Sequence, residues 1–284
     1  MGKTFKTIDD AVIRFAGDSG DGMQLTGGRF TETTAVVGND LSTLPDFPAE
    51  IRAPAGSLAG VSAFQIHFSS KDIHTPGDSP DVLVAMNPAA LKVHQSEIVP
   101  GGTIILNTDA FTKKNLNFAG YESNPVEDGT LDDYFTLIPI EMNKLVTAAC
   151  EDLDMSRKFV GRTKNFFALG VLYYMYDRPL DATEKWLEKK FAGKDVIIEA
   201  NKRAMNAGYN YADTTELFTT RFKIEKAVLP KGTYRNINGN YATSLGLLAA
   251  SEKSGLKLFY GGYPYSSYFS RLEAFWRPNI SGRG

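Results

Sequence analysis

Short apolar runs alternate with longer segments of helical pattern over the first two thirds of the chain. This alternation is typical of a parallel or mixed β-sheet covered by helices, and it predicts an α/β fold. The predicted strands, about five in number, cover residues 11–17, 61–70, 81–87, 101–109 and 134–140. The predicted helices cover residues 23–38, 89–97, 141–153, 165–176, 181–193 and 195–213. Asn87 and Pro88 form the N-cap and first-turn pair that is expected to open the helix 89–97. The segment 165–176 is apolar on nearly every side, which predicts a buried helix.

Proline and glycine interrupt this pattern at two places. Residues 41–60, LSTLPDFPAEIRAPAGSLAG, are rich in both, and we expect a loop there without a regular element. Residues 214–232 are polar and contain proline and glycine, which predicts a domain boundary. We expect a second unit after it, with a glycine-bearing turn, an alanine-rich helix and a short strand.

The charge balance and the cysteine content narrow the choice of partners. The chain has 284 residues and a formal net charge of −2, so it has no strong basic field. This argues against binding to nucleic acid or to an anionic membrane, and it favours small-molecule or protein partners. The single cysteine, Cys150, excludes an intramolecular disulfide and a cluster held by four cysteines of this chain. We expect a cytoplasmic protein whose iron–sulfur chemistry, if any, lies in another chain.

A glycine loop follows the predicted strand 11–17, in the sequence RFAGDSGDGMQLTGG. A strand, a glycine turn and a helix N-terminus bring backbone N–H groups together and favour anions. Ser19 stands where a dinucleotide-binding fingerprint has a glycine, so the match to that fingerprint is poor. Asp18 and Asp21 would repel a phosphate unless they point away from it. The spacing alone leaves open a tight structural turn or a site for a phosphate-type ligand.

Four segments occur in an order that is typical of one enzyme family. They are GDSGDGMQLTGG, LPDFPAEIRAPAGSLAGVSAFQIHF, RTKNFFALG and NGNYATSLGLLAASEKSGLKLFYGGYP. The chain resembles the alpha subunit of 2-oxoacid:ferredoxin oxidoreductases. It is most similar to the 2-oxoglutarate type, in which a gamma domain is fused to the N-terminus of the alpha chain. The resemblance runs from about Ala11 to Pro264, and FPAEIRAPAG is its most specific segment.

The resemblance implies a domain organisation. Residues 8–213 would form a Rossmann-like gamma domain, with a parallel or mixed sheet covered by helices, and residues 214–232 a linker. Residues 233–264 would begin a second α/β domain, of the pyrimidine-binding type found in thiamine enzymes. Residues 265–284 depart from the family pattern and would form an aberrant tail. We expect a truncated alpha chain, and we hypothesise that a frameshift after Pro264 produces this tail.

The resemblance also implies a reaction shared among chains. Thiamine diphosphate adds to the 2-oxoacid, carbon dioxide leaves, and electrons pass through an iron–sulfur cluster to ferredoxin while coenzyme A takes the acyl group. In the family, the thiamine and the cluster are bound largely by the beta subunit, and the gamma domain is associated with coenzyme A and with subunit packing. The chain alone should therefore not catalyse the reaction, and we assign it no catalytic or metal-ligating residue.

Two groups of residues are the site predictions that follow from the resemblance. The residues expected to contact coenzyme A on the glycine loop are Gly17, Ser19, Gly20, Gly22, Met23 and Gln24. Glu50 and Arg52 are expected to contact the partner subunit or coenzyme A. An alternative from another class stays open: a non-catalytic module that binds coenzyme A or assists subunit assembly. The sequence does not decide which 2-oxoacid is used.

Overall fold

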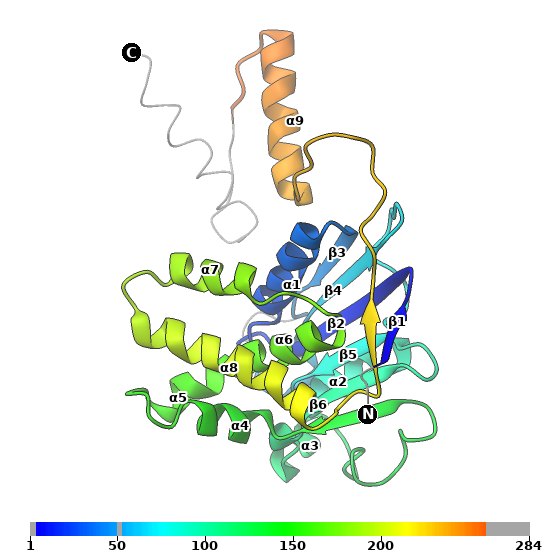
Figure 1. Cartoon of the computed structure of the whole chain (residues 1–284), viewed down its shortest axis with the longest axis vertical. Helices are drawn as coiled ribbons and strands as arrows, with labels where there is room; N and C mark the ends of the chain where they lie inside the picture. The colour runs from blue at the N-terminus through cyan, green and yellow to red at the C-terminus, as the bar shows by residue number, and fades with distance from the viewer. Residues whose placement is uncertain (1–3, 50–52, 260–284) are drawn as a thin grey trace. The chain divides into compact units, whose positions relative to one another are not determined.

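The computed structural model describes residues 4–49 and 53–259 (Figure 1). The chain divides into two compact units, Met1–Pro230 and Lys231–Gly284, which are described separately. The first unit contains β1 (Thr4–Thr7), β2 (Asp10–Asp18), α1 (Met23–Val37), β3 (Asp40–Asp46), β4 (Val61–Ser69), β5 (Val82–Ala85), α2 (Pro88–His94), β6 (Thr103–Asn107), α3 (Lys113–Phe118), β7 (Thr136–Ile140), α4 (Met142–Ala149), α5 (Arg157–Val160), α6 (Lys164–Met175), α7 (Asp181–Lys190), α8 (Asp195–Thr214) and β8 (Thr220–Lys223).

A mixed sheet forms the centre of the first unit. Among the described residues it has six strands in the order β3-β4-β2-β5-β6-β7. Strands β2, β5, β6 and β7 are parallel, whereas β4 runs antiparallel to both β2 and β3. In this register Phe15 of β2 lies opposite Phe64 of β4 and Val84 of β5. The five strands expected from the hydrophobic pattern are all present, and the predicted α/β fold is confirmed.

The sixth strand, β3, corrects the expectation of an irregular loop over residues 41–60. Its residues Asp40–Asp46 pair with β4, and Pro45 lies opposite Phe64. Proline has no backbone N–H, so it is tolerated in a strand that pairs on one side, at the edge of a sheet. The prolines therefore confine this segment to the edge of the sheet without preventing a strand.

Helices cover both faces of the sheet and bury two hydrophobic cores (Figure 1). Ile13 and Phe15 of β2 face a core that includes residues of α1, α4, α6 and α8. Ala16, the next residue, faces a smaller core that includes residues of α2. Successive residues of a strand point to opposite faces, so α1 and α2 lie on opposite sides of the sheet.

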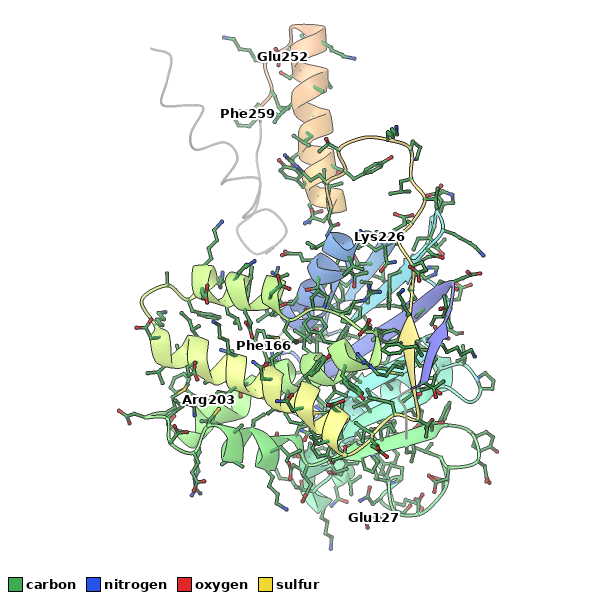
Figure 2. The ribbon with its side chains drawn as sticks, viewed as in Figure 1. Glu127, Phe166, Arg203, Lys226, Glu252 and Phe259 are labelled. Carbon is green, nitrogen blue, oxygen red and sulfur yellow. The ribbon has the colours of Figure 1, made fainter. Side chains whose placement is uncertain are left out.

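Helix α6 is buried as its apolar sequence predicts, and it crosses α8 at very short range. Phe166, labelled in Figure 2, is one of its eleven buried residues. A Cβ atom at Gly170 would lie 2.0 Å from the Met205 carbonyl oxygen, and one at Gly208 would lie 2.0 Å from that of Phe167. The two glycines therefore allow the backbones to meet where any side chain would clash.

The predicted linker 214–232 needs a correction, because much of it is built into the first unit. Strand β8 pairs in parallel with β1, and Arg221 of β8 is buried. Its Nε atom donates to the Tyr174 carbonyl oxygen at 2.9 Å, and one terminal nitrogen lies 2.7 Å from the Asp177 carboxylate. Further on, Lys226 lies against Gly38 (Figure 2). The first unit thus extends to Pro230.

The second unit contains helix α9, Gly239–Ser254, as the alanine-rich pattern predicts. The Asn238 side chain caps it by accepting from the Tyr241 amide at 2.9 Å, and Gly255 ends it with a φ of 70°. Residues 256–259 form no strand, so the short strand expected after this helix is absent from the described residues. Residues 260–264 and the predicted tail 265–284 lie outside the described residues.

Candidate functional site

The glycine loop lies at the topological switch point of the sheet. Strands β2 and β5 are parallel neighbours, and the helices that follow them, α1 and α2, lie on opposite faces. In open α/β sheets, ligands bind in the crevice at the carboxyl ends of two such strands. The loop between β2 and α1 therefore occupies the position where this fold offers a ligand site.

The glycines of the loop differ in how much space their surroundings leave for a side chain. Gly22 has a φ of 79°, and a Cβ atom there would lie 2.6 Å from the Asn165 side-chain nitrogen. A Cβ at Gly17 would lie 2.9 Å from a carboxylate oxygen of Asp21. At Gly20 a Cβ would meet nothing within 4 Å in the described structure. Gly17 and Gly22 are thus required by the fold of the loop, whereas Gly20 borders open space.

The N-terminus of α1 presents backbone donors. Its cap residue, Gly22, is left-handed and provides no side-chain cap within the described structure. The first intrahelical bond runs from the Thr26 amide to the Gly22 carbonyl oxygen at 3.0 Å. Within residues 4–49 and 53–259, the amides of Met23, Gln24 and Leu25 meet no acceptor. These N–H groups and the positive end of the helix dipole are available to a ligand.

Asp21 is turned away from these donors and is neutralised by a lysine. One carboxylate oxygen accepts from the Asp18 amide at 3.0 Å, and the other lies 2.8 Å from the Nζ atom of Lys164. The side chains are 14% and 17% exposed, so water screens this ion pair less than it would a surface pair. Lys164 begins α6, and the ion pair fixes the start of that helix to the glycine loop.

Asp18 connects the glycine loop to the proline-rich segment. Both oxygens of its carboxylate accept from the Gly56 amide, each at 3.1 Å. The next residue, Ser19, donates its amide to the Gly60 carbonyl oxygen at 3.3 Å. Burial raises the pKa of Asp18, the Gly56 N–H lowers it, and the neighbouring Asp21 charge raises it again. Asp18 therefore links the glycine loop to the proline-rich segment through the Gly56 amide.

The predicted contact residues fall into three groups. Gly17, Ser19, Gly20 and Gly22 form the loop itself. Met23 is 2% exposed, and its side chain packs in the larger hydrophobic core. Gln24 donates to the carbonyl oxygens of Asp46 and Ala63, at 3.0 and 2.7 Å, which fixes α1 to β3 and β4. Glu50 and Arg52 lie outside the described residues.

Three residues at this site received no ligand role from the sequence. Asn87 was expected as the cap of the helix after β5, and it does cap α2, through the Ala90 amide at 2.8 Å. Its side-chain amide also hydrogen-bonds the Asp18 carboxylate, which lowers the pKa of Asp18. Lys164 and Asn165 belong to the segment RTKNFFALG. The sequence could have marked them as site candidates only because they form a polar pair directly before a strongly apolar stretch. Their contacts to Asp21 and Gly22 come from tertiary structure, which local patterns do not report.

Two other features are absent from the part of the chain that the structure describes. Residues 4–49 and 53–259 contain no group of three or more histidine, cysteine, aspartate or glutamate side chains placed to hold a metal ion. No helix in those ranges is long and apolar enough to span a bilayer. The glycine loop with its surrounding residues is therefore the candidate site.

Comparison with known proteins decides the family. Residues 12–211 match the family model described as pyruvate ferredoxin/flavodoxin oxidoreductase. The chain belongs to this family. That membership confirms the resemblance that the four sequence segments predict.

Curated proteins similar to this chain are considerably longer than it. The chain is 52% identical over 257 residues to the 2-oxoglutarate oxidoreductase subunit KorA of Mycobacterium tuberculosis, which is 90% of this chain and 39% of KorA. It is 25% identical over 208 residues to the ketoisovalerate oxidoreductase subunit VorA of Methanothermobacter marburgensis, which is 70% of this chain and 36% of VorA. The family member described here thus spans about two fifths of the length of these curated relatives.

Solved structures agree on the fold. The 2-oxoglutarate:ferredoxin oxidoreductase of Magnetococcus marinus, determined with 2-oxoglutarate, coenzyme A and succinyl-CoA bound, matches 97% of this chain with a TM-score of 0.69. The identity is 24%, and the match covers 43% of that chain. The gamma subunit of a keto/oxoacid ferredoxin oxidoreductase from Geobacter sulfurreducens matches 73% of this chain and 98% of its own, with 16% identity and a TM-score of 0.51.

Proposed function

We propose that this family member supplies the gamma-domain part of the alpha subunit of a 2-oxoglutarate:ferredoxin oxidoreductase. The observation that carries the proposal is the 52% identity to KorA over 257 residues. The complete enzyme would convert 2-oxoglutarate and coenzyme A into succinyl-CoA and carbon dioxide, and electrons would pass one at a time to ferredoxin. The likeness to KorA, a 2-oxoglutarate oxidoreductase subunit, supports 2-oxoglutarate as the 2-oxoacid.

Within that complex we propose that this chain binds coenzyme A and packs against the other subunits, and we assign it no catalytic residue. A partner beta subunit would hold the thiamine diphosphate and the iron–sulfur cluster, which agrees with a single cysteine in this chain. Coenzyme A would bind at the glycine loop, where the first amides of α1 lie at the carboxyl ends of β2 and β5. Residues 233–264 would begin the next domain of the alpha subunit, and α9 would be its first helix.

Isothermal titration of the full chain with coenzyme A, followed by copurification with the beta subunit, tests this proposal. We expect saturable binding of coenzyme A, no binding of NADH at the same concentration, and a stable complex with the beta subunit. A complex without any binding of coenzyme A would favour the subunit-assembly module instead. If neither ligand nor beta subunit bound, the proposed function would be wrong.

The choice of 2-oxoacid is tested with the assembled holoenzyme. Reduction of ferredoxin is measured with 2-oxoglutarate, pyruvate and 2-oxoisovalerate in turn, with and without coenzyme A. The proposal expects the highest kcat/KM with 2-oxoglutarate. Preference for the branched 2-oxoacid would assign the complex to the substrate class of VorA.

A further inference from the structure

An exposed apolar surface is formed by the proline-rich segment and the end of α3. Leu58 is 44% exposed, and Pro54 and Ala55 of the same segment are exposed as well. Phe118, the last residue of α3, is 54% exposed. A Cβ atom at Gly56 would lie 3.9 Å from a ring carbon of Phe118, so the segment and the helix end are in contact. We call this surface, made of Pro54, Ala55, Leu58 and Phe118, the edge patch.

The edge patch lies at the same edge of the sheet as the glycine loop. Asp18, the last residue of β2, pairs with Val61, the first residue of the antiparallel strand β4. The segment before Val61 therefore reaches the sheet at the carboxyl end of β2. The Gly56 amide, between Ala55 and Leu58, donates to the Asp18 carboxylate at 3.1 Å. A molecule that covers the glycine loop from this side also meets the edge patch.

The loop that presents the edge patch is ordered by its own hydrogen bonds. Ser57 donates its amide and its hydroxyl to the Pro54 carbonyl oxygen, at 3.1 and 2.7 Å. The Gly60 amide donates to the Ser57 carbonyl oxygen at 3.1 Å. A loop that is already ordered loses little conformational entropy when a partner binds. Its exposed apolar side chains are therefore suited to a protein–protein contact.

Two lysines of α3 flank the edge patch without a counter-ion. Lys113 and Lys114 are exposed, and neither forms an ion pair within residues 4–49 and 53–259. The Nζ atom of Lys114 lies 5.6 Å from the centre of the Phe118 ring. Complementary charges guide protein association, so the fitting partner has an apolar surface bordered by acidic side chains.

This charge pattern disfavours a second copy of the chain as the occupant. In a two-fold dimer the same patch lies on both sides of the interface. Lys113 and Lys114 of both copies would then be brought together, and the edge patch contains no acidic residue to offset them. An apolar centre and a formal net charge of −2 also do not suit nucleic acid.

We propose that the edge patch docks the beta subunit, through an apolar surface of that subunit with an acidic border. The identity of the partner rests on the proposed function. If coenzyme A binds at the glycine loop and receives an acyl group formed on the beta subunit, the beta subunit has to approach this edge of the sheet. The edge patch is the exposed apolar surface that it meets there, and the contact would bury Leu58 and Phe118.

Substitutions at the apolar centre test the contact. Binding of the full chain to the beta subunit is measured by isothermal titration. Leu58→Asp and Phe118→Asp should each weaken binding about tenfold or more, because a carboxylate would be placed in an apolar contact with an acidic border. Val196→Asp on α8 is the matched control, since Val196 is 42% exposed and outside the edge patch, and it should bind like the wild type. Thermal melts check that all three variants fold.

A second pair of variants tests the lysines. Lys114→Glu should weaken binding about fivefold at low salt, and the difference should shrink at high salt because salt screens exposed charges. Lys189→Glu, at an exposed position of α7, makes the same change in net charge and should have no such effect. Equal weakening by both variants would contradict a specific role of the α3 lysines.

The failure of this inference can be told from failure of the proposed function. If the wild-type chain binds the beta subunit and both Leu58→Asp and Phe118→Asp bind it equally well, the edge patch is not the docking surface and the proposed function stands. If these variants instead change only the self-association of the chain, measured by sedimentation, the occupant is a second copy and the inference is wrong. If the wild-type chain does not bind the beta subunit at all, the proposed function and the inference are both wrong.

Discussion

Helices α1 and α2 begin at the same edge of the sheet, directly after neighbouring parallel strands, yet their N-termini are built differently. The N-terminus of α2 is closed: Asn87 caps the Ala90 amide, and Pro88 at the first helical position has no N–H to satisfy. The N-terminus of α1 begins after a left-handed glycine, and its first amides meet no acceptor in the described structure.

This difference separates a structural helix start from one that is available to a ligand. Asp18 and Asp21 stand next to α1, where a carboxylate could cap the helix, but both bind elsewhere, to Gly56 and to Lys164. The N-terminus of α1 thus has no side-chain cap in the described structure, although carboxylates stand beside it in the sequence. Because α2 is capped and α1 is not, at one switch point, we propose that the donors of α1 are kept for binding.

The largest effect on stability is expected from Gly22→Ala. Alanine at a φ of 79° is strained, and its Cβ would lie 2.6 Å from the Asn165 nitrogen. We expect a loss of about 2–3 kcal/mol in the free energy of unfolding, measured by urea denaturation. Gly20→Ala is the matched control, because a Cβ there meets nothing within 4 Å, and it should stay within about 0.5 kcal/mol of the wild type. Equal losses in both variants would contradict this description of the loop.

The cap of α2 should have the next largest effect. Asn87→Ala removes the acceptor of the Ala90 amide, and we expect the free energy of unfolding to fall by about 1 kcal/mol. Asn117→Ala, at an exposed position of α3, is the control and should be close to neutral. An Asn87→Ala variant as stable as this control would mean that the cap of α2 contributes nothing.

The pH dependence of stability tests the environment of Asp18. Burial raises its pKa above the ordinary value of 3.8, so the folded state binds a proton more readily than the unfolded state. The buried negative charge of Asp18 therefore lowers the free energy of unfolding at every pH above the raised pKa. This loss of stability disappears as the pH falls to 3.8 and below. The stability of Asp18→Asn relative to the wild type should therefore be highest at neutral pH and decrease as the pH falls.

Thermal melts of both proteins between pH 7 and pH 3.5 measure this trend, with Asp72→Asn as the control. The control shows how much of any trend comes from the removal of one exposed carboxylate. If the relative stability of Asp18→Asn rose towards acid pH, the pKa of Asp18 would be lowered by its partners, and burial would not dominate its environment.

Charge reversal at Arg52 should leave stability unchanged. Arg52 precedes Gly56 in the sequence, and the Gly56 amide donates to the Asp18 carboxylate of the glycine loop. We expect weaker assembly with the beta subunit or weaker binding of coenzyme A, with the melting temperature of the isolated chain unaltered. Copurification, titration and a thermal melt measure the three quantities. A variant that lost thermal stability alone would show that Arg52 has a structural role.

Local patterns predicted the strands and helices of the sheet well, because buried strands and apolar helices carry strong periodicity. They also predicted Asn87 and Pro88 as a helix start, since capping depends on adjacent residues. Strand β3 was missed because proline was taken to exclude a strand, although an edge position tolerates it. Strand β8 was missed because its partner, β1, lies at the other end of the unit.

The sequence predicted the position of the glycine loop but not the contacts that its aspartates make. The glycine loop has a local signature, so its position at the end of β2 followed from the sequence. The partners of its aspartates lie far along the chain, at Gly56 and Lys164, and no local pattern reports such pairs. Met23 and Gln24 were assigned to the ligand on the resemblance to the family; their side chains pack or bind the neighbouring strands, so a ligand contact there stays a prediction for their backbone amides.

Hydrogen exchange at the two helix starts, with and without coenzyme A, tests the central claim most directly. The amides of Met23, Gln24 and Leu25 are compared with the Ala90 amide, which Asn87 already protects. We predict that coenzyme A slows exchange at the first turn of α1 and leaves the first turn of α2 unchanged, while NADH at the same concentration alters neither. Equal protection of α1 by both ligands, or protection confined to α2, would contradict the account.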